Sequence, residues 1–91
     1  MEFTKEKNRI YKKEAGKTIA EVLFPDKGEG VVAITRTFVD KSLRGQGIAD
    51  ELLSAVAREL QEQGKQAVAI CSYAVDWFEK HPEHAGLLKR T

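Results

Sequence analysis

The most regular pattern of apolar residues lies in the second half of the chain and predicts an amphipathic helix. Ile48, Leu52, Val56 and Leu60 recur at every fourth position. This spacing places one apolar face along a helix that can cover a sheet. The helix is expected over residues 48–63, because a glycine follows at position 64 as a natural left-handed cap.

Apolar and β-branched segments on both sides of this helix predict strands. Residues 17–24 alternate between apolar and polar, residues 31–39 are largely β-branched, and residues 67–71 form a short apolar run. Residues 8–13 give a weaker edge strand. Proline, aspartate and glycine in residues 25–30 predict a turn, so the two strands around it should form an antiparallel hairpin.

The order strand, helix, strand predicts a βαβ unit whose two strands are parallel. A second, short helix is expected over residues 73–80, because the residue before Pro82 disfavours the helical conformation. The expected fold class is therefore α/β with a mixed sheet, in which antiparallel strands lead into one parallel βαβ pair, with two helices. We expect one small domain that covers residues 1–91.

Composition and charge exclude several classes of function. Apolar residues make up 42% of the 91 residues, enough for one core, and none of their runs approaches the roughly 20 needed to span a membrane. The net charge of +1, with acidic and basic residues interleaved, argues against nucleic-acid binding. The single cysteine, Cys71, excludes an internal disulfide and favours a reducing compartment, so the expected location is the cytoplasm.

The turn before the long helix is the candidate anion site. Gly45 and Gly47 allow backbone N–H groups to approach an anion closely, and the first turn of the helix adds further donors. A P-loop does not fit, because no Gly-Lys-Ser/Thr has a glycine at the required spacing before it. A dinucleotide fingerprint does not fit either, because Asp50 stands where a third glycine or alanine is needed. The alternative is a turn that only lets the helix pack close to the sheet.

A third pattern fits this turn. Arg44-x-x-Gly47-x-Ala49, after a strand and at the start of a helix, resembles the acetyl-CoA-binding motif of the GCN5-related N-acetyltransferase (GNAT) superfamily. Further segments resemble its compact, YjdJ-type members over most of the chain: Phe38-Val39, Cys71-Ser72-Tyr73 and His81-Pro82-Glu83. The resemblance implies a reduced acetyltransferase fold that keeps the cofactor half and lacks much of the acceptor-binding half.

The resemblance also implies where acetyl-CoA binds. The backbone of the turn would hold the pyrophosphate, through Arg44, Gly45, Gln46, Gly47, Ile48 and Ala49. The parallel strands would splay apart beside the helix, and the pantetheine arm would bond to the backbone of Thr37, Phe38 and Val39. Such proteins often have His-Thr where this chain has Arg36-Thr37, so no histidine role is assigned there; Arg36 would reach solvent or the phosphates.

The thioester would point toward Cys71 and Tyr73, the two candidate catalytic residues. As a thiolate, Cys71 could accept the acetyl group, or it could be a small buried apolar residue. Tyr73 could protonate the leaving thiolate, or it could pack as a rim aromatic against Trp77. His81 and His84 are three positions apart with no further ligand nearby, so they give no closed metal site and are expected at a solvated helix end; either could still serve as a base for the acceptor.

The expected function is N-acetyl transfer from acetyl-CoA to an amine, by direct attack or through an acetyl-Cys71 intermediate. The alternative is a non-catalytic module that binds CoA or acetyl-CoA and acts with a partner protein. The acceptor is a small-molecule or protein amine, with no nucleic acid, membrane or metal involved. The acceptor's identity, the general base and the oligomeric state stay open.

Overall fold

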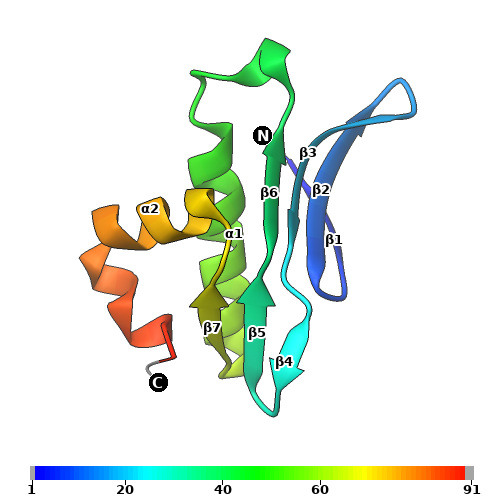
Figure 1. Cartoon of the computed structure of the whole chain (residues 1–91). Helices are drawn as coiled ribbons and strands as arrows, with labels where there is room; N and C mark the ends of the chain where they lie inside the picture. The colour runs from blue at the N-terminus through cyan, green and yellow to red at the C-terminus, as the bar shows by residue number, and fades with distance from the viewer. Residues whose placement is uncertain (1, 90–91) are drawn as a thin grey trace.

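The computed structural model describes residues 2–89 and contains two small sheets that share a long, bent hairpin (Figure 1). Its strands are β1 (Thr4–Glu6), β2 (Arg9–Glu14), β3 (Lys17–Leu23), β4 (Asp26–Gly28), β5 (Val31–Ile34), β6 (Arg36–Val39) and β7 (Gln66–Ala69). Its helices are the 3-10 helix η1 (Lys41–Leu43), α1 (Ile48–Gln63), α2 (Ser72–Lys80) and the 3-10 helix η2 (Pro82–Leu87). One sheet has the order β1-β2-β3-β6 and the other β4-β5-β7. The mixed α/β fold class is therefore confirmed.

Two tight turns form the N-terminal part of the four-stranded sheet. Ala15 and Gly16 both have positive φ, 50° and 77°, which gives the β2–β3 hairpin the primed turn that suits strand twist. Asn8, at φ 62°, connects β1 to β2, and asparagine tolerates this conformation better than most residues. Strand β1 was not expected, because its three residues are all exposed and carry no apolar alternation.

The segment expected as one strand over residues 31–39 divides into β5 and β6. The division occurs at Thr35, and each half joins a different sheet: β5 pairs with β4 and β7, and β6 pairs with β3. Across the hairpin, Pro25 has no N–H to donate to the ladder, and the register shifts within β4. The predicted antiparallel hairpin is confirmed, but its turn is shorter than expected, since residues 26–28 form strand β4 and only residues 29–30 make the turn.

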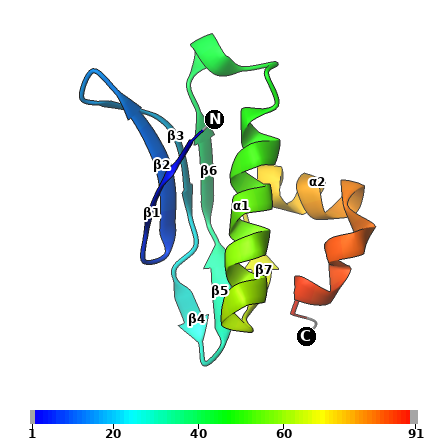
Figure 2. The same ribbon diagram turned by 180° about the vertical axis from the view of Figure 1, so that it is seen from behind.

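The predicted βαβ unit is confirmed. Strands β5 and β7 are parallel, with Val31 opposite Gln66 and Ile34 opposite Ala69, and α1 connects the two sides. Helix α1 packs along one face of both sheets, as Figure 2 shows from behind, and ends at Gly64 with φ 66°. Its apolar stripe and the alternating positions of β3 form the core with the sheet and α2, in which these side chains are nearly inaccessible: Ile10, Ala20, Val22, Val32, Ile34, Leu52, Val56, Leu60, Trp77 and Phe78.

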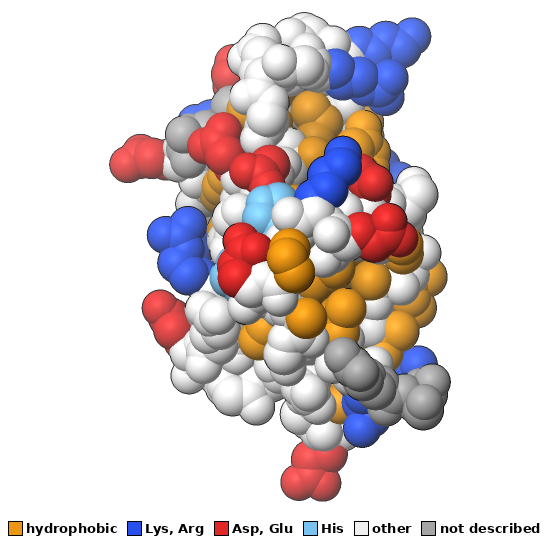
Figure 3. Space-filling view, turned by 90° about the vertical axis from the view of Figure 1, so that its left-hand side faces the viewer, with side chains coloured by type: hydrophobic (Ala, Val, Ile, Leu, Met, Phe, Trp, Pro, Cys, Tyr) orange, Lys and Arg blue, Asp and Glu red, His pale blue; other side chains and the backbone are white. Residues whose placement is uncertain are grey.

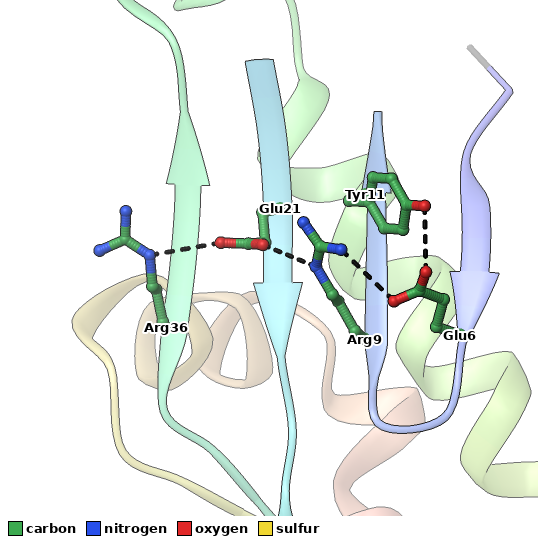
Figure 4. A network of polar contacts seen from close by, with 5 residues as sticks. All are labelled: Glu6, Arg9, Tyr11, Glu21 and Arg36. Atoms are coloured by element: carbon green, nitrogen blue, oxygen red, sulfur yellow. Dashed lines mark hydrogen bonds and ion pairs between the residues drawn. The ribbon is translucent and has the colours of Figure 1, made fainter. Parts of the chain in front are cut away.

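The face of the four-stranded sheet that points away from α1 carries a ladder of charges (Figure 4). Glu21 accepts a hydrogen bond from Arg9 at 2.7 Å and lies 3.5 Å from Arg36, and Glu6 bonds to Arg9 and to the Tyr11 hydroxyl. The hydrogen bond to Glu21 raises the pKa of Arg9, while burial, with Glu6 adding to it, raises the pKa of Tyr11. Alternating charges thus replace apolar side chains on this face. Within residues 2–89 no helix is long and apolar enough to cross a membrane.

Candidate functional site

The two sheets diverge beside the start of α2. The β5–β7 ladder ends where the N–H groups of Ile70 and Cys71 both donate to the carbonyl oxygen of Ile34, each at 3.1 Å. Beyond this point β6 pairs with β3, and the chain after β7 enters α2. Because β6 is the last strand in its sheet, one of its edges has no strand neighbour among the described residues. The backbone of Thr37, Phe38 and Val39 therefore lies on an open strand edge that faces the start of α2, and we call this opening the gap. That the pantetheine arm binds along this edge stays a prediction.

The glycine turn connects this gap to the N-terminus of α1. Gly45 and Gly47 have φ 84° and 75°, and Gly47 is the N-cap residue of the helix. No side chain caps this end, so the first N–H groups of α1 have no intrahelical partner. A Cβ built on either glycine would meet no atom within 4 Å. Close packing of the helix against the sheet is therefore not the reason for glycine at these two positions. The positive φ values and the accessible N–H groups explain the glycines instead.

The preceding 3-10 helix holds the turn in place through Asp40. Its carboxylate accepts hydrogen bonds from the Ser42 hydroxyl at 2.7 Å and from the Ser42 N–H at 3.1 Å. These two bonds, with a smaller contribution from Lys17, lower the pKa of Asp40. The Gln46 side chain donates to the Ser42 carbonyl oxygen at 3.3 Å, and the Arg44 Nε lies 3.5 Å from the Val39 carbonyl oxygen.

A small hollow joins the turn to α2. It has a volume of about 150 Å³ and is lined by Val39, Leu43, Arg44, Gly45, Gly47, Ile48, Ala49 and Tyr73. The structure thus brings the glycine turn and one candidate catalytic residue to the same hollow. Tyr73 is 43% exposed. The expected alternative, an aromatic packed on Trp77, is not seen, because Trp77 packs on Phe78, His81 and His84 instead.

Cys71 lies on the opposite side of the gap from β6. It is the N-cap residue of α2, it is half-buried, and its Sγ is 3.3 Å from the Oγ1 of Thr37. Either atom can be the donor in this contact. Thr37 was expected to contribute only its backbone, and its hydroxyl contact with the sulfur could not be read from the sequence.

A second cluster connects α1 to α2 next to the glycine turn. Asp50, in the first turn of α1, accepts a hydrogen bond at 2.7 Å from the Trp77 indole, and the His81 Nε2 lies 3.2 Å from the same carboxylate oxygen. The His81 Nδ1 lies 2.8 Å from the Trp77 carbonyl oxygen, and its ring stacks on the indole. The expected solvated helix end is therefore wrong for His81, because packing on Trp77 half-buries the ring. The ring of His84 also stacks on the Trp77 indole.

One more alternative that the sequence left open, the direction of the Arg36 side chain, is decided by its contacts. Arg36 lies on the sheet face away from α1 and pairs with Glu21, so it does not line the hollow at the glycine turn. Among residues 2–89, no three His, Cys, Asp or Glu side chains come together as a metal site. The residues that sequence reasoning missed are the Thr37 hydroxyl, Asp50 and His81. Only the position of Asp50 directly after the glycine turn gave any signal.

Comparison with known proteins identifies the family. The family model described as GCN5-related N-acetyl-transferase matches residues 8–87. The chain belongs to the GCN5-related N-acetyltransferase family. The match covers the glycine turn, the gap and both candidate catalytic residues, and it confirms the superfamily suggested by the sequence motif. The YjdJ-type subgroup stays a prediction, and no curated protein matches the chain.

Solved structures with the GNAT fold match most of this chain but different shares of their own length. A GCN5-like N-acetyltransferase-family protein from Staphylococcus aureus is 25% identical, with a TM-score of 0.81 over 99% of this chain and 89% of that chain. An N-acetyltransferase from Staphylococcus aureus Mu50 is 23% identical, with a TM-score of 0.64 over 81% of this chain but 50% of its own length. An aminoglycoside N-acetyltransferase in complex with CoA is 23% identical, with a TM-score of 0.51 over 91% of this chain and 67% of that chain. Family and fold together support acetyl transfer.

Proposed function

We propose that this chain is a single-domain acetyltransferase that binds acetyl-CoA at the glycine turn and transfers the acetyl group to an amine. The observation that carries the proposal is the gap between β6 and α2, with the glycine turn at one end and Cys71 beside Tyr73 on its far wall. A structural relative of the same fold is a complex with CoA, which supports this choice of cosubstrate.

The turn suits the pyrophosphate of acetyl-CoA. Backbone N–H groups at a helix N-terminus bind anions, and the guanidinium of Arg44 adds a charged donor at the same hollow. A volume of 150 Å³ is smaller than the roughly 300–1,000 Å³ of sites that enclose a whole ligand. The hollow would therefore hold one segment of acetyl-CoA, while the pantetheine arm follows the free edge of β6.

In the first proposed route, Cys71 is the nucleophile that accepts the acetyl group. The Cys71 thiolate attacks the thioester carbonyl carbon, a new carbon–sulfur bond forms, and the bond to the sulfur of CoA breaks. The leaving thiolate takes a proton from the Tyr73 hydroxyl. The amine nitrogen then attacks the acetyl carbon, the bond to the Cys71 sulfur breaks to leave a thiolate, and the proton lost by the amine passes to the Tyr73 phenolate, which restores both residues. In the alternative route the amine attacks acetyl-CoA directly, with Tyr73 as the acid in the same position.

Mass spectrometry separates the two routes. After mixing with acetyl-CoA, the first route predicts a protein adduct one acetyl group heavier, which Cys71→Ala lacks. Full turnover by Cys71→Ala, with no adduct on the wild-type chain, would contradict the intermediate and support direct attack. Because this chemistry needs a free thiol, we place it in a reducing compartment, the cytoplasm.

A non-catalytic CoA-binding module that acts with a partner is the second candidate. It is favoured by one observation: the chain spans 50% of the length of one N-acetyltransferase with the same fold. Both candidates predict cofactor binding, and only the first predicts that acetyl-CoA is consumed when an amine is added. Loss of acetyl-CoA over time, with and without an amine, therefore distinguishes them.

A further inference from the structure

A larger hollow lies on the outer face of α2, next to the glycine-turn hollow. It has a volume of about 620 Å³ and is lined by Ile70, Ser72, Tyr73, Val75, Asp76 and Glu79. Tyr73 lines both hollows, so its side chain is a wall shared by the two. Ile70 and Ser72 are the direct neighbours of Cys71 in the chain. The outer hollow therefore borders the place where the acetyl group would arrive, with Tyr73 between the two hollows.

The surface of the outer hollow is unusually apolar for an exposed helix face. Ile70, Tyr73 and Val75 are the exposed large hydrophobic residues of the described chain, at 55%, 43% and 42%. Hydrophobic side chains gather on this side of the molecule and acidic ones border them (Figure 3). An exposed apolar patch with a polar border is typical of a binding surface.

The outer hollow is also acidic and contains no basic side chain. Ser72, Asp76 and Glu79 follow one another on one face of α2, at helical spacing. At 1.5 Å per residue, Asp76 lies about 7.5 Å and Glu79 about 12 Å along the helix from Cys71. Asp76 is partly neutralised by Lys80 at 3.0 Å, whereas Glu79 has no ion-pair or hydrogen-bond partner among residues 2–89.

We propose that the outer hollow binds the acceptor, and that the acceptor is a linear amine with an apolar stem and a second, distal ammonium group. The stem would lie against Ile70, Tyr73 and Val75, and the distal charge would lie near Glu79. The proximal nitrogen, as the neutral amine, then forms a bond to the acetyl carbon beside Cys71, the carbon–sulfur bond breaks to leave a thiolate, and the proton lost by nitrogen passes to the Tyr73 phenolate. This inference rests on the proposed acetyl transfer and names its substrate class.

Paired amines test the proposal. The release of CoA is measured with diaminopentane and with n-pentylamine, which share a stem and differ in the distal ammonium. We expect a higher kcat/KM for the diamine, with a preference that shrinks as salt is raised, because exposed charges are screened. Glu79→Gln should reduce the ratio of the two kcat/KM values by about two- to fivefold, the size expected for one exposed ion pair. Glu83→Gln, on η2 outside the hollow, is the matched control and should keep the wild-type ratio.

Lys80→Met gives an effect of opposite sign. The substitution removes the ion pair of Asp76 with Lys80, so the Asp76 carboxylate can also attract the distal ammonium. The ratio of kcat/KM for diamine to kcat/KM for monoamine should therefore rise by about twofold. Equal kcat/KM for diamine and monoamine, or a ratio that Glu79→Gln leaves unchanged, would overturn the inference while acetyl transfer itself stands. If acetyl-CoA binds but no amine increases its consumption, the proposed enzyme activity fails, and this inference fails with it.

Discussion

The two walls of the gap are built in different ways. The glycine-turn wall is local: Asp40, Ser42, Gln46 and the cap at Gly47 lie within one short stretch and bond to one another. The α2 wall is held by contacts across the chain, since Cys71 meets Thr37 34 residues away and Trp77 meets Asp50 27 residues away. The glycine-turn wall therefore depends on backbone conformation, whereas the α2 wall depends on contacts between side chains that are distant in the sequence.

Because of this difference, we expect substitutions in the two walls to have different effects. Backbone donors at the turn cannot be removed by changing a side chain, so only a clash, a charge or a change of conformation breaks that wall. The α2 wall presents a thiol, a phenol and carboxylates, so single substitutions there should change rates and acceptor choice without destroying the cofactor site. Substitutions in each wall can break or sharpen this contrast.

The largest effect is expected for Gly47→Asp. The added side chain enters the anion site, places a negative charge there and strains the left-handed backbone. Each lost hydrogen bond to a charged group costs about 1.5–3 kcal/mol, so acetyl-CoA affinity should fall by about 100-fold or more. Isothermal titration calorimetry measures the loss.

Gly30→Asp is the matched control for this change. Gly30 has φ 71° and also has open space around it, but it lies in the β4–β5 turn, away from the gap. It should lose some stability and keep its affinity for acetyl-CoA. Equal loss of affinity in the two variants would mean that backbone strain, and not an anion site, explains the result.

The Thr37→Val variant tests the contact between the walls. Valine keeps the shape of threonine but removes the hydroxyl that lies 3.3 Å from the Cys71 sulfur. A hydrogen bond to a charged group contributes about 1.5–3 kcal/mol, so loss of the bond to the Cys71 thiolate should slow acetylation by about tenfold or more. Quenched-flow mass spectrometry gives this rate. Acetyl-CoA affinity should stay the same, and Thr37→Ser should restore the rate, whereas a failure of serine to do so would point to packing.

A smaller effect on binding is expected for Trp77→Phe. The substitution keeps an aromatic ring but removes the indole N–H that bonds to Asp50, so the Asp50 carboxylate beside the anion site loses one partner. We expect acetyl-CoA affinity to fall by about two- to threefold, the size of a weak charge interaction.

The Asp50→Asn background isolates this charge effect in a double-mutant cycle. Once the carboxylate has been replaced, Trp77→Phe should leave acetyl-CoA affinity unchanged. An equal loss in both backgrounds would show that the indole acts through packing. Thermal unfolding of all four proteins accounts separately for the stability lost with the buried Trp77.

The smallest effect concerns pH and the Asp40 carboxylate. Hydrogen bonds from Ser42 lower the pKa of Asp40, so its contribution to stability is present above the unfolded-state pKa, about 3.9. This contribution is lost as the pH falls through the lower, folded-state value. In an NMR pH titration the Ser42 amide should shift with a midpoint below about 3.9, the ordinary pKa of an unperturbed aspartate. A midpoint at or above that value would contradict the assigned hydrogen bonds.

The same contrast explains what the sequence could predict. Helix α1, the alternation in β3 and the Gly47 cap follow from patterns within a few residues, and the structure confirms these elements. Strand β1 has no apolar signal, and the division of the long strand at Thr35 depends on which sheet each half joins. Such features arise from tertiary pairing, which a local pattern does not contain.

The candidate site shows the same division. The position of the glycine turn before α1 could be predicted from the motif, and Tyr73 lines the hollow beside that turn. The contact of Trp77 and His81 with Asp50 joins three segments distant in sequence, and His81 was expected to be solvated. The His81 ring stacks on the Trp77 indole, and the position of that indole depends on how α2 packs on α1, which a local sequence pattern does not contain.

An NMR titration with acetyl-CoA tests the proposed cofactor site most directly, because it reports on both walls at once. We predict that the amides of Phe38, Val39, Gly45, Gly47 and Ala49 shift together with those of Cys71 and Tyr73, while those of β1 stay fixed. Shifts confined to other parts of the chain, or no shift at a large excess of acetyl-CoA, would contradict a cofactor site in the gap.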